Sequence, residues 1–316
     1  MNSKQLLYFL TTAELQSISA ASRKLDVAQP SITLQIDNLE HELGCVLFER
    51  DYKGMRLTDS GEEFKLHAQT IVRQIEQSKA DIKSKGASLS GPLVIGMNQP
   101  TCNSLAVPLV TKFKERFPNV DLDLRTALSY NLKQALQKGE IDLAISSYDG
   151  GDAGGLEFDF LFREQLYVVM GIEPKNENLQ PLLNVNEISG SELAGYELMV
   201  TSKQDSLGYI VSEYEKTSGV SLKKVRPFGQ LMTSLRYIVD GFGLLLTPST
   251  SFFHLLENKQ VHALVVQEPT LWRDVYLVRK SDRPKTDLMR IACQLIEEVR
   301  DEEHAAGHWQ GAKNRA

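Results

Sequence analysis

The sequence predicts an α/β protein in three parts, which are a small helical domain, one long helix, and a larger domain of alternating strands and helices. Three observations lead to this fold class. Residues 1–60 contain short amphipathic helical patterns joined by a tight turn, and residues 61–89 keep a helical apolar repeat without a break. Residues 91–302 alternate strand-like and helix-like segments, which is typical of sheets covered by helices.

The composition is that of an ordinary globular protein, with 24% charged and 42% apolar residues. No apolar run approaches the ~18 residues that a membrane-spanning helix needs, so we expect no contact with a membrane. The three cysteines, Cys45, Cys102 and Cys293, lie far apart, which argues against disulfides and fits a reducing cytoplasm. Because the net charge is −6, any interaction with nucleic acid must depend on where the basic groups sit.

The stretch from Gln29 to Leu43 predicts an amphipathic helix. Ile32, Ile36, Leu39 and Leu43 follow one another at i, i+4, i+7 and i+11, which places them in one apolar stripe. Gly44 is a suitable terminator after the last turn. The opposite face carries mostly short polar side chains that can donate or accept hydrogen bonds. Its residues, with neighbours at the helix start, are Gln29, Pro30, Ser31, Thr33, Leu34, Gln35 and Asn38.

A helix–turn–helix is predicted over about residues 18–37, where a second short helix precedes this one. Such pairs often read DNA through the second helix, although they also occur in proteins without that function. The polar side chains can hydrogen-bond base edges, and Leu34 can contact a thymine methyl group. A small β-hairpin around Lys53 and Gly54 follows, so Arg50, Lys53 and Arg56 are candidates for phosphate contacts from a wing.

One long helix is predicted next, with Asp59 and Glu62 at the spacing of a capping box. Its apolar repeat alternates between steps of four and three residues, which favours a contact between two chains. The alternative is an amphipathic helix that packs on its own domain. The repeat consists of Phe64, Ala68, Ile71, Ile75, Ser78, Ile82, Lys85 and Leu89, and the polar residues Ser78 and Lys85 weaken it.

The third part begins after a break at residues 86–92. Its alternating strands and helices predict mostly parallel sheets with helices on both faces. A strand and a helix that return at residues 275–302 indicate two lobes with a chain crossover. Residues 303–316 suggest a loose tail, in which His304 and His308 lack a third ligand for a metal ion.

Several short motifs recur in a fixed order along the chain. They include Val27-Ala28-Gln29-Pro30-Ser31, Leu39-Glu40-x-Glu42-Leu43-Gly44, Leu57-Thr58-x-x-Gly61, Phe113-x-x-x-Phe117-Pro118, Gly139-x-x-Asp142-x-Ala144 and Gly241-x-Gly243. This order resembles the LysR-type transcriptional regulators over about residues 1–300. Leu34 departs from the pattern, because that variable position is often basic in the family.

The resemblance implies a winged helix–turn–helix over residues 1–60 and a dimerisation helix over residues 61–89. It also implies an effector domain similar to the type 2 periplasmic binding proteins, with lobe I at 91–162 and 268–302 and lobe II at 163–267. The expected partners are double-stranded DNA with a pseudo-palindromic operator and further copies of the chain, as a homodimer or homotetramer. RNA polymerase is a further candidate partner. The implied ligand is a small organic effector, and the implied location is the cytoplasm.

Candidate effector contacts follow the predicted strands, because ligands of open α/β sheets sit beyond the carboxyl ends of the strands. The helix that starts after the first strand would attract a carboxylate. Among these turns only Lys203 is basic, which favours a mono-acid or a neutral solute. Each candidate also has an interpretation as a cap or turn residue. The candidates are Asn98, Gln99, Pro100, Thr101, Cys102, Ser146, Ser147, Thr201, Ser202 and Thr247.

Three alternatives remain open at this point. A regulator of the same family can act without an effector, and residues 89–96 faintly resemble the nitrogen assimilation control subgroup. A cytoplasmic small-solute binding protein would not need residues 1–60. An enzyme has only the α/β class in its favour, since no catalytic triad, carboxylate pair or phosphate-binding loop is evident. We therefore predict a protein that is not an enzyme and needs no cofactor or metal.

Overall fold

The computed structural model describes residues 1–51, 54–83, 89–147, 152–202, 205–282, 286–309 and 311. At positions 50, 51, 77 and 80–83 it describes the backbone only. The chain divides into two compact units, Met1–Pro92 and Leu93–Ala316. Among the described residues, no helix combines the length and apolar character that crossing a membrane requires.

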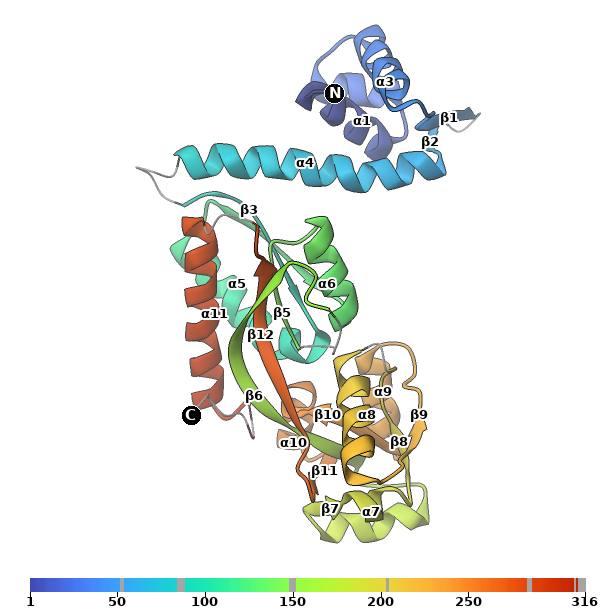
Figure 1. Cartoon of the computed structure of the whole chain (residues 1–316), viewed down its shortest axis with the longest axis vertical. Helices are drawn as coiled ribbons and strands as arrows, with labels where there is room; N and C mark the ends of the chain where they lie inside the picture. Colours follow the sequence, from blue (N-terminus) through green and yellow to red (C-terminus); the bar gives the residue numbers. More distant parts are fainter. Residues whose placement is uncertain are drawn as a thin grey trace. The chain divides into compact units, whose positions relative to one another are not determined.

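The N-terminal unit is a helix–turn–helix followed by a hairpin and a long helix, as predicted (Figure 1). Ser17 caps the first helix of the pair, because its hydroxyl accepts the N–H of Ala20. Gly44 ends the second helix with a φ of 69°, in the left-handed region that glycine adopts at little cost. The elements are α1 (Ser3–Leu15), α2 (Ile18–Leu25), α3 (Gln29–Leu43), β1 (Phe48–Asp51), β2 (Gly54–Leu57) and α4 (Asp59–Lys83).

The core of this unit forms where α3 packs against α1. Ile32, Ile36 and Leu39 of α3 are buried, as the apolar stripe predicted. Phe9 of α1 contributes the central ring of the same cluster. Leu43, the fourth residue of the predicted stripe, is 39% exposed, because α3 ends there and no further turn continues the stripe.

The start of α4 differs from the prediction. Thr58 caps the helix, because its hydroxyl accepts the N–H of Gly61 at 3.0 Å. The predicted capping box that begins at Asp59 is therefore wrong, since Asp59 already lies in the helix. Gly61 is required here, because a Cβ atom at this position would lie 2.1 Å from the carbonyl oxygen of Leu47.

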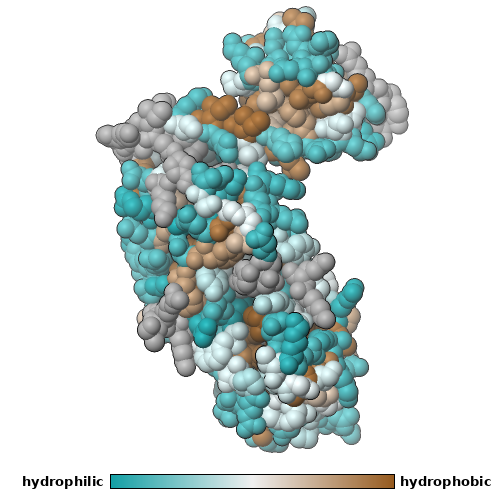
Figure 2. Space-filling view, viewed as in Figure 1, coloured by the Kyte–Doolittle hydropathy of each residue, from teal (hydrophilic) through white to brown (hydrophobic). Residues whose placement is uncertain are grey.

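The first half of the predicted two-chain seam on α4 packs within its own unit instead. Ala68 is fully buried, and Phe64 and Ile71 pack against the same cluster as α1. The rings of Phe64 and Phe9 lie 5.0 Å apart. Leu66 remains 46% exposed, and Figure 2 shows apolar side chains gathered over the middle of α4 and over α1. Lys85 of the predicted repeat lies outside the described residues, and the predicted helix is wrong at Leu89, which has no helical structure.

The second unit is built on a sheet with helices on both of its faces, in line with the predicted α/β class (Figure 1). The order of its strands is β4-β3-β5-β12-β6-β10-β8-β9, and β11 pairs with β6 and β7. Its elements are β3 (Gly91–Met97), α5 (Gln99–Arg116), β4 (Val120–Thr126), α6 (Ser129–Lys138), β5 (Leu143–Ser147), β6 (Leu156–Gly171), η1 (Glu177–Asn184), β7 (Glu187–Ser189), α7 (Gly190–Leu193), β8 (Glu197–Met199), α8 (Ser206–Ser218), β9 (Lys223–Val225), α9 (Leu231–Val239), β10 (Leu244–Pro248), η2 (Ser249–Ser251), α10 (Phe253–Glu257), β11 (Val261–Gln267), β12 (Trp272–Lys280) and α11 (Asp287–Ala305).

Two lobes share the long strand β6. This strand pairs with β12 as far as Gln165 and with β10 from Leu166 onward. The prediction of mostly parallel sheets is wrong here, because β6 and β12 run antiparallel to each of the partners described for them. The chain returns from the second group of strands when β12 begins at Trp272. We therefore call residues 93–165 and 272–309 lobe I, and residues 166–271 lobe II. The earlier boundaries at residues 162 and 268 were expectations from resemblance, and the change of strand partner lies a little later at both places.

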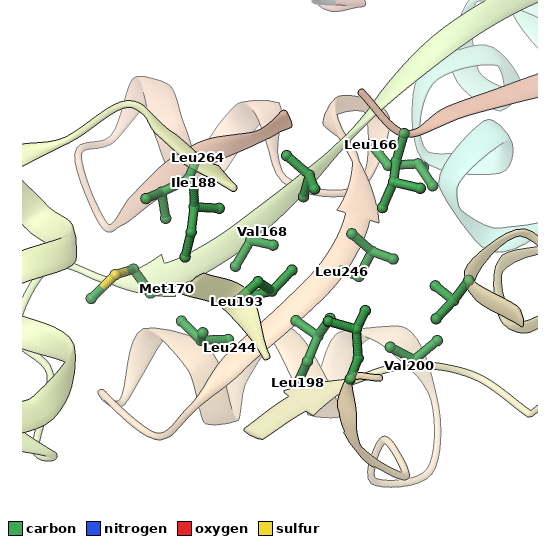
Figure 3. Close-up of a cluster of buried hydrophobic side chains, with 14 of the residues drawn as sticks. Leu166, Val168, Met170, Ile188, Leu193, Leu198, Val200, Leu244, Leu246 and Leu264 are labelled. Atoms are coloured by element: carbon green, nitrogen blue, oxygen red, sulfur yellow. The ribbon is translucent and has the colours of Figure 1, made fainter. Parts of the chain in front are cut away.

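The buried apolar core of lobe II packs against one face of the sheet (Figure 3). Leu166, Val168 and Met170 project from one face of β6, because alternate residues of a strand point the same way. Leu244 and Leu246 of β10 pack against them. This packing fixes the end of β10, which carries Thr247.

The predicted loose tail is wrong for residues 303–309. Helix α11 continues to Ala305, and the side chain of Trp309 is only 2% exposed. Its indole N–H donates to Glu164 Oε2 at 2.8 Å, and its ring lies 4.1 Å from that of Phe162. A tryptophan that buries its ring and finds an acceptor for its N–H overrides the polar composition of the surrounding segment.

The contact between Trp309 and Glu164 gives a stability prediction. Trp309→Phe keeps an aromatic ring but leaves a buried carboxylate oxygen without this donor. We expect the second unit to lose about 1–3 kcal/mol of its free energy of unfolding, measured by denaturant titration followed by circular dichroism. Asp301→Asn, which removes an exposed partner of Arg300, serves as the control and should cost less than about 1 kcal/mol. Equal losses in both variants would contradict the role of the buried contact.

Candidate functional sites

The polar face of α3 points away from the core, as predicted. Gln29, Pro30, Ser31 and Asn38 are exposed, and Leu34 is exposed by 57%. Thr33 and Gln35 are half-buried at the edge of this face. The side chains of this face do not pack in the core, so they are available for contact with another molecule.

Two hydrogen bonds fix the beginning of this face. The side-chain oxygen of Gln29 accepts the hydroxyl of Ser19 at 3.1 Å, which ties α3 to α2. The hydroxyl of Thr33 donates to the carbonyl oxygen of Gln29 at 3.2 Å. The first turn of α3 is thus oriented before any partner binds.

The predicted wing is a hairpin of β1 and β2. Arg56 is exposed on β2, and Glu49 lies directly opposite it on β1. Arg50 lies opposite Met55, and only its backbone is described. Lys53 lies outside the described residues. Of the three basic candidates, the structure therefore places the side chain of Arg56 alone.

A cavity of about 420 Å³ lies between lobe I and lobe II. It is lined at the start of four helices, α5, α6, α8 and α9, and at the end of β10. Apolar side chains such as Leu128, Leu207 and Leu231 complete its wall. The lining residues that the sequence had singled out are Asn98, Gln99, Pro100, Thr201 and Thr247.

Five other candidates do not line this cavity. The side chain of Thr101 is fully buried, and its amide donates to Asn98 Oδ1 at 3.1 Å. Cys102 Sγ accepts the hydroxyl of Thr126 at 3.5 Å. Ser202 is exposed. Ser146 and Ser147 line a separate cavity of only about 10 Å³ beside Phe158.

Sequence analysis missed several polar residues of the cavity. Ser129 and Ser206 are the first residues of α6 and α8. They could have been predicted, because the argument that ligands bind beyond the carboxyl ends of strands holds for each helix that follows a strand and not for α5 alone. Arg273 lies within β12, far along the chain, where no local pattern marks it. The polar residues missed are Thr126, Ser129, Asn131, Asp205, Ser206, Gln230, Ser234 and Arg273.

Charged groups are few around the cavity. Among the described residues that line it, only Asp205 and Arg273 carry charges. Arg273 donates through Nε to Glu164 Oε1 at 2.7 Å and also through its Nη2, so its charge is balanced by a buried carboxylate. Asn98 Nδ2 is buried without a hydrogen-bond partner in the described part of the chain. The described residues contain no group of three or more His, Cys, Asp or Glu that could hold a metal ion.

A helix–turn–helix with an outward polar face, joined to a two-lobed unit with a cavity between its lobes, is the architecture expected of a DNA-binding transcriptional regulator with a substrate-binding domain. Comparison with known families identifies the chain more closely. Residues 3–62 match the bacterial regulatory helix–turn–helix proteins of the lysR family, and residues 86–301 match the LysR substrate binding domain. The chain belongs to the LysR family of transcriptional regulators, as the motifs had predicted.

Several known proteins are similar along most of the chain. An uncharacterised HTH-type transcriptional regulator of Bacillus subtilis (strain 168), YwqM, is 35% identical over 78% of this chain and 82% of its own length. The nitrogen assimilation regulatory protein nac of Escherichia coli (strain K12) is 26% identical over 79% of each chain. Full-length CbnR, solved in complex with its target DNA, shares the fold with a TM-score of 0.67, at 20% identity over 95% of this chain and 99% of CbnR.

The outward face of α3 leads to a prediction about base recognition. Replacing Gln35 with Ala should weaken binding to the chain's own operator by about 1–3 kcal/mol and relax base preference at one position, because base contacts carry sequence information. Quantitative footprinting on the region upstream of the chain's gene measures both effects. His41→Ala is the matched control, because His41 is exposed in the last turn of α3 and outside the predicted face.

The hairpin leads to a different prediction for Arg56→Ala. Loss of a phosphate contact should weaken binding to specific and random DNA alike and lower the slope of log K against log salt by about one unit. Titrations at several salt concentrations give that slope. A loss confined to the operator would assign Arg56 to base reading instead.

Proposed function

We propose that this regulator is gated by a small organic effector that binds in the cavity of about 420 Å³ between lobe I and lobe II. The observation that carries the proposal is that both lobes line this one cavity, with Asn98 and Ser129 from lobe I and Thr201 and Thr247 from lobe II. A ligand there contacts both lobes at once, so its affinity depends on how they are arranged. Unequal affinity for two arrangements is what allows a ligand to change DNA binding.

On the DNA side, we propose that α3 enters the major groove of double-stranded DNA. Two copies of the chain would then read a pseudo-palindromic operator with half-sites about 34 Å apart, or a multiple of that distance. The structure of CbnR was solved with target DNA, which supports this partner for a chain of the same fold. The proposed effector-contacting residues remain those of the cavity, and the proposed DNA contacts remain the outward face of α3 with Arg50, Lys53 and Arg56.

We further propose that the chain assembles as a homodimer or homotetramer in the cytoplasm. The exposed Leu66 and the apolar surface over α4 support a contact between copies through this helix (Figure 2). Residues Phe64, Ala68 and Ile71 belong to the core of their own unit and are left out of the proposed contact. RNA polymerase stays a candidate partner for activation of transcription.

A second candidate function is a regulator of the same family that acts without an effector. One observation favours it, because both charged groups among the described residues of the cavity wall already have partners within the chain. Arg273 binds Glu164, and Asp205 accepts hydrogen bonds from Ser129 and Thr201. A metabolite screen by thermal shift on the full chain, followed by footprinting with and without each hit, separates the two candidates.

Gating predicts a defined effect of Asn98→Asp. The carboxylate keeps the acceptor for the amide of Thr101 but replaces the unpartnered Nδ2 donor with an acceptor. We expect the effector concentration for half-maximal response to rise about 5- to 13-fold, while operator affinity without effector stays unchanged, because a good hydrogen bond contributes about 1–1.5 kcal/mol.

The matched control for this variant is Asn178→Asp, which introduces the same charge in η1, away from this cavity. Its response curve should follow that of the unmodified protein. An unchanged curve for Asn98→Asp would remove Asn98 from the effector site, and a footprint insensitive to every binding compound would leave the regulator without gating at this cavity.

A further inference from the structure

Asp205 is in the position of a helix cap but does not cap its own helix. It precedes the first residue of α8, yet its side chain makes no cap hydrogen bond to α8. Its Oδ2 accepts the hydroxyl of Thr201 at 2.9 Å. Its Oδ1 accepts the backbone N–H of Ser129 at 3.3 Å, which lies in the other lobe.

Ser129 is the first residue of α6, and this helix lacks a cap of its own. The residue before it, Leu128, has an apolar side chain that cannot accept a hydrogen bond. The free N–H groups and the dipole at a helix N-terminus favour a negative charge. The carboxylate of Asp205 in lobe II thus supplies the anion that α6 in lobe I attracts.

The contact between Asp205 and Ser129 is buried and has a second hydrogen bond beside it. Asp205 is only 6% exposed, and Ser129 and Ser206 are also buried. The hydroxyl of Ser129 donates to the hydroxyl of Ser206 at 3.3 Å, again across the two lobes. All three residues line the cavity of about 420 Å³.

Asp205 has no basic side chain as a partner on the described wall, because its two oxygens accept only the hydroxyl of Thr201 and the backbone N–H of Ser129. Arg273 is the other charged lining residue, and Glu164 already balances it. The wall also carries one buried donor without a partner among the described residues, which is Nδ2 of Asn98. Asn98 as a whole residue is 6% exposed. The wall therefore offers a negative acceptor from lobe II and a neutral donor from lobe I.

We propose that Asp205 determines the charge selectivity of this cavity, an inference that rests on the proposed effector function. The chain's own carboxylate occupies the anion site at the start of α6. An effector therefore presents a cationic group, or a neutral hydrogen-bond donor, to Asp205 and an acceptor to Asn98. A carboxylate placed at the same point is rejected, because two like charges in a buried site repel each other.

Three probes of one shape test this selectivity. Benzamidinium, benzamide and benzoate differ in charge but share a planar group on a ring, and the ring suits the apolar wall formed by Leu207, Leu231 and Leu245. Calorimetric titration of the full chain at neutral pH gives the dissociation constant of each probe. We expect benzamidinium to bind at least ~10-fold more tightly than benzoate, with benzamide in between, because one charge interaction of this kind changes affinity by about one power of ten or more.

Asp205→Asn removes the charge and keeps the shape and an acceptor for the N–H of Ser129. The preference for benzamidinium over benzoate should fall at least ~10-fold in this variant. Asp287→Asn is the matched control, because Asp287 is exposed in the first turn of α11, pairs with Arg290, and does not line the cavity. If Asp205→Asn does not fold, as judged by thermal melting, Asp205→Ser takes its place.

The outcomes separate this inference from the proposed gating. An unchanged preference in Asp205→Asn, a preference of the unmodified protein for benzoate, or no binding of any probe would each overturn the role of Asp205. A preference that depends on Asp205, but without any effect of a bound probe on the operator footprint, would support the selectivity and count against gating by this class of ligand.

Discussion

The second unit depends on a buried ion pair at the place where its two lobes share strands. Glu164 on β6 and Arg273 on β12 face each other across the strands, next to the point where β6 changes partners. Burial of two charges is costly unless their remaining hydrogen-bonding groups are also satisfied. Trp309 meets this condition by donating to the second oxygen of Glu164. The cluster of Glu164, Arg273 and Trp309 therefore joins the paired strands β6 and β12 to the segment after α11. Through Arg273 it also reaches the cavity wall.

The first unit meets a simpler constraint, which is that α3 can bury only one side. Ile32, Ile36 and Leu39 take up the packing surface offered by α1, and Phe9 extends the same core to α4. The remaining side of α3 faces outward because its side chains are mostly polar and would be costly to bury without partners. The surface that reads DNA in this interpretation is thus a consequence of packing, and the bond between Ser19 and Gln29 only refines its orientation.

Local patterns in the sequence predicted the local parts of this structure. The apolar stripe of α3, the hairpin after it and the terminator Gly44 depend on neighbours within a few residues, and all three are confirmed except for Leu43 at the end of the stripe, which is exposed. The use of Phe64 in an intrachain core could not be predicted, because a helical repeat does not say which surface it meets. Long-range contacts were also hidden, since Trp309 and Glu164 lie far apart along the chain. The candidates for the cavity were found where strands end, but Arg273 was missed because it lies inside a strand.

The charge that we propose for the effector differs from the sequence-based expectation for a local reason. The start of α5 was expected to attract a carboxylate, yet the amide of Thr101 there already donates to Asn98. The start of α6 receives Asp205 in the same way. Two helix N-termini at this wall thus have acceptors from the chain itself, one within a lobe and one across the lobes. Because the second of these contacts joins lobe I to lobe II, a ligand that competes with it or adds to it acts directly on the arrangement of the lobes.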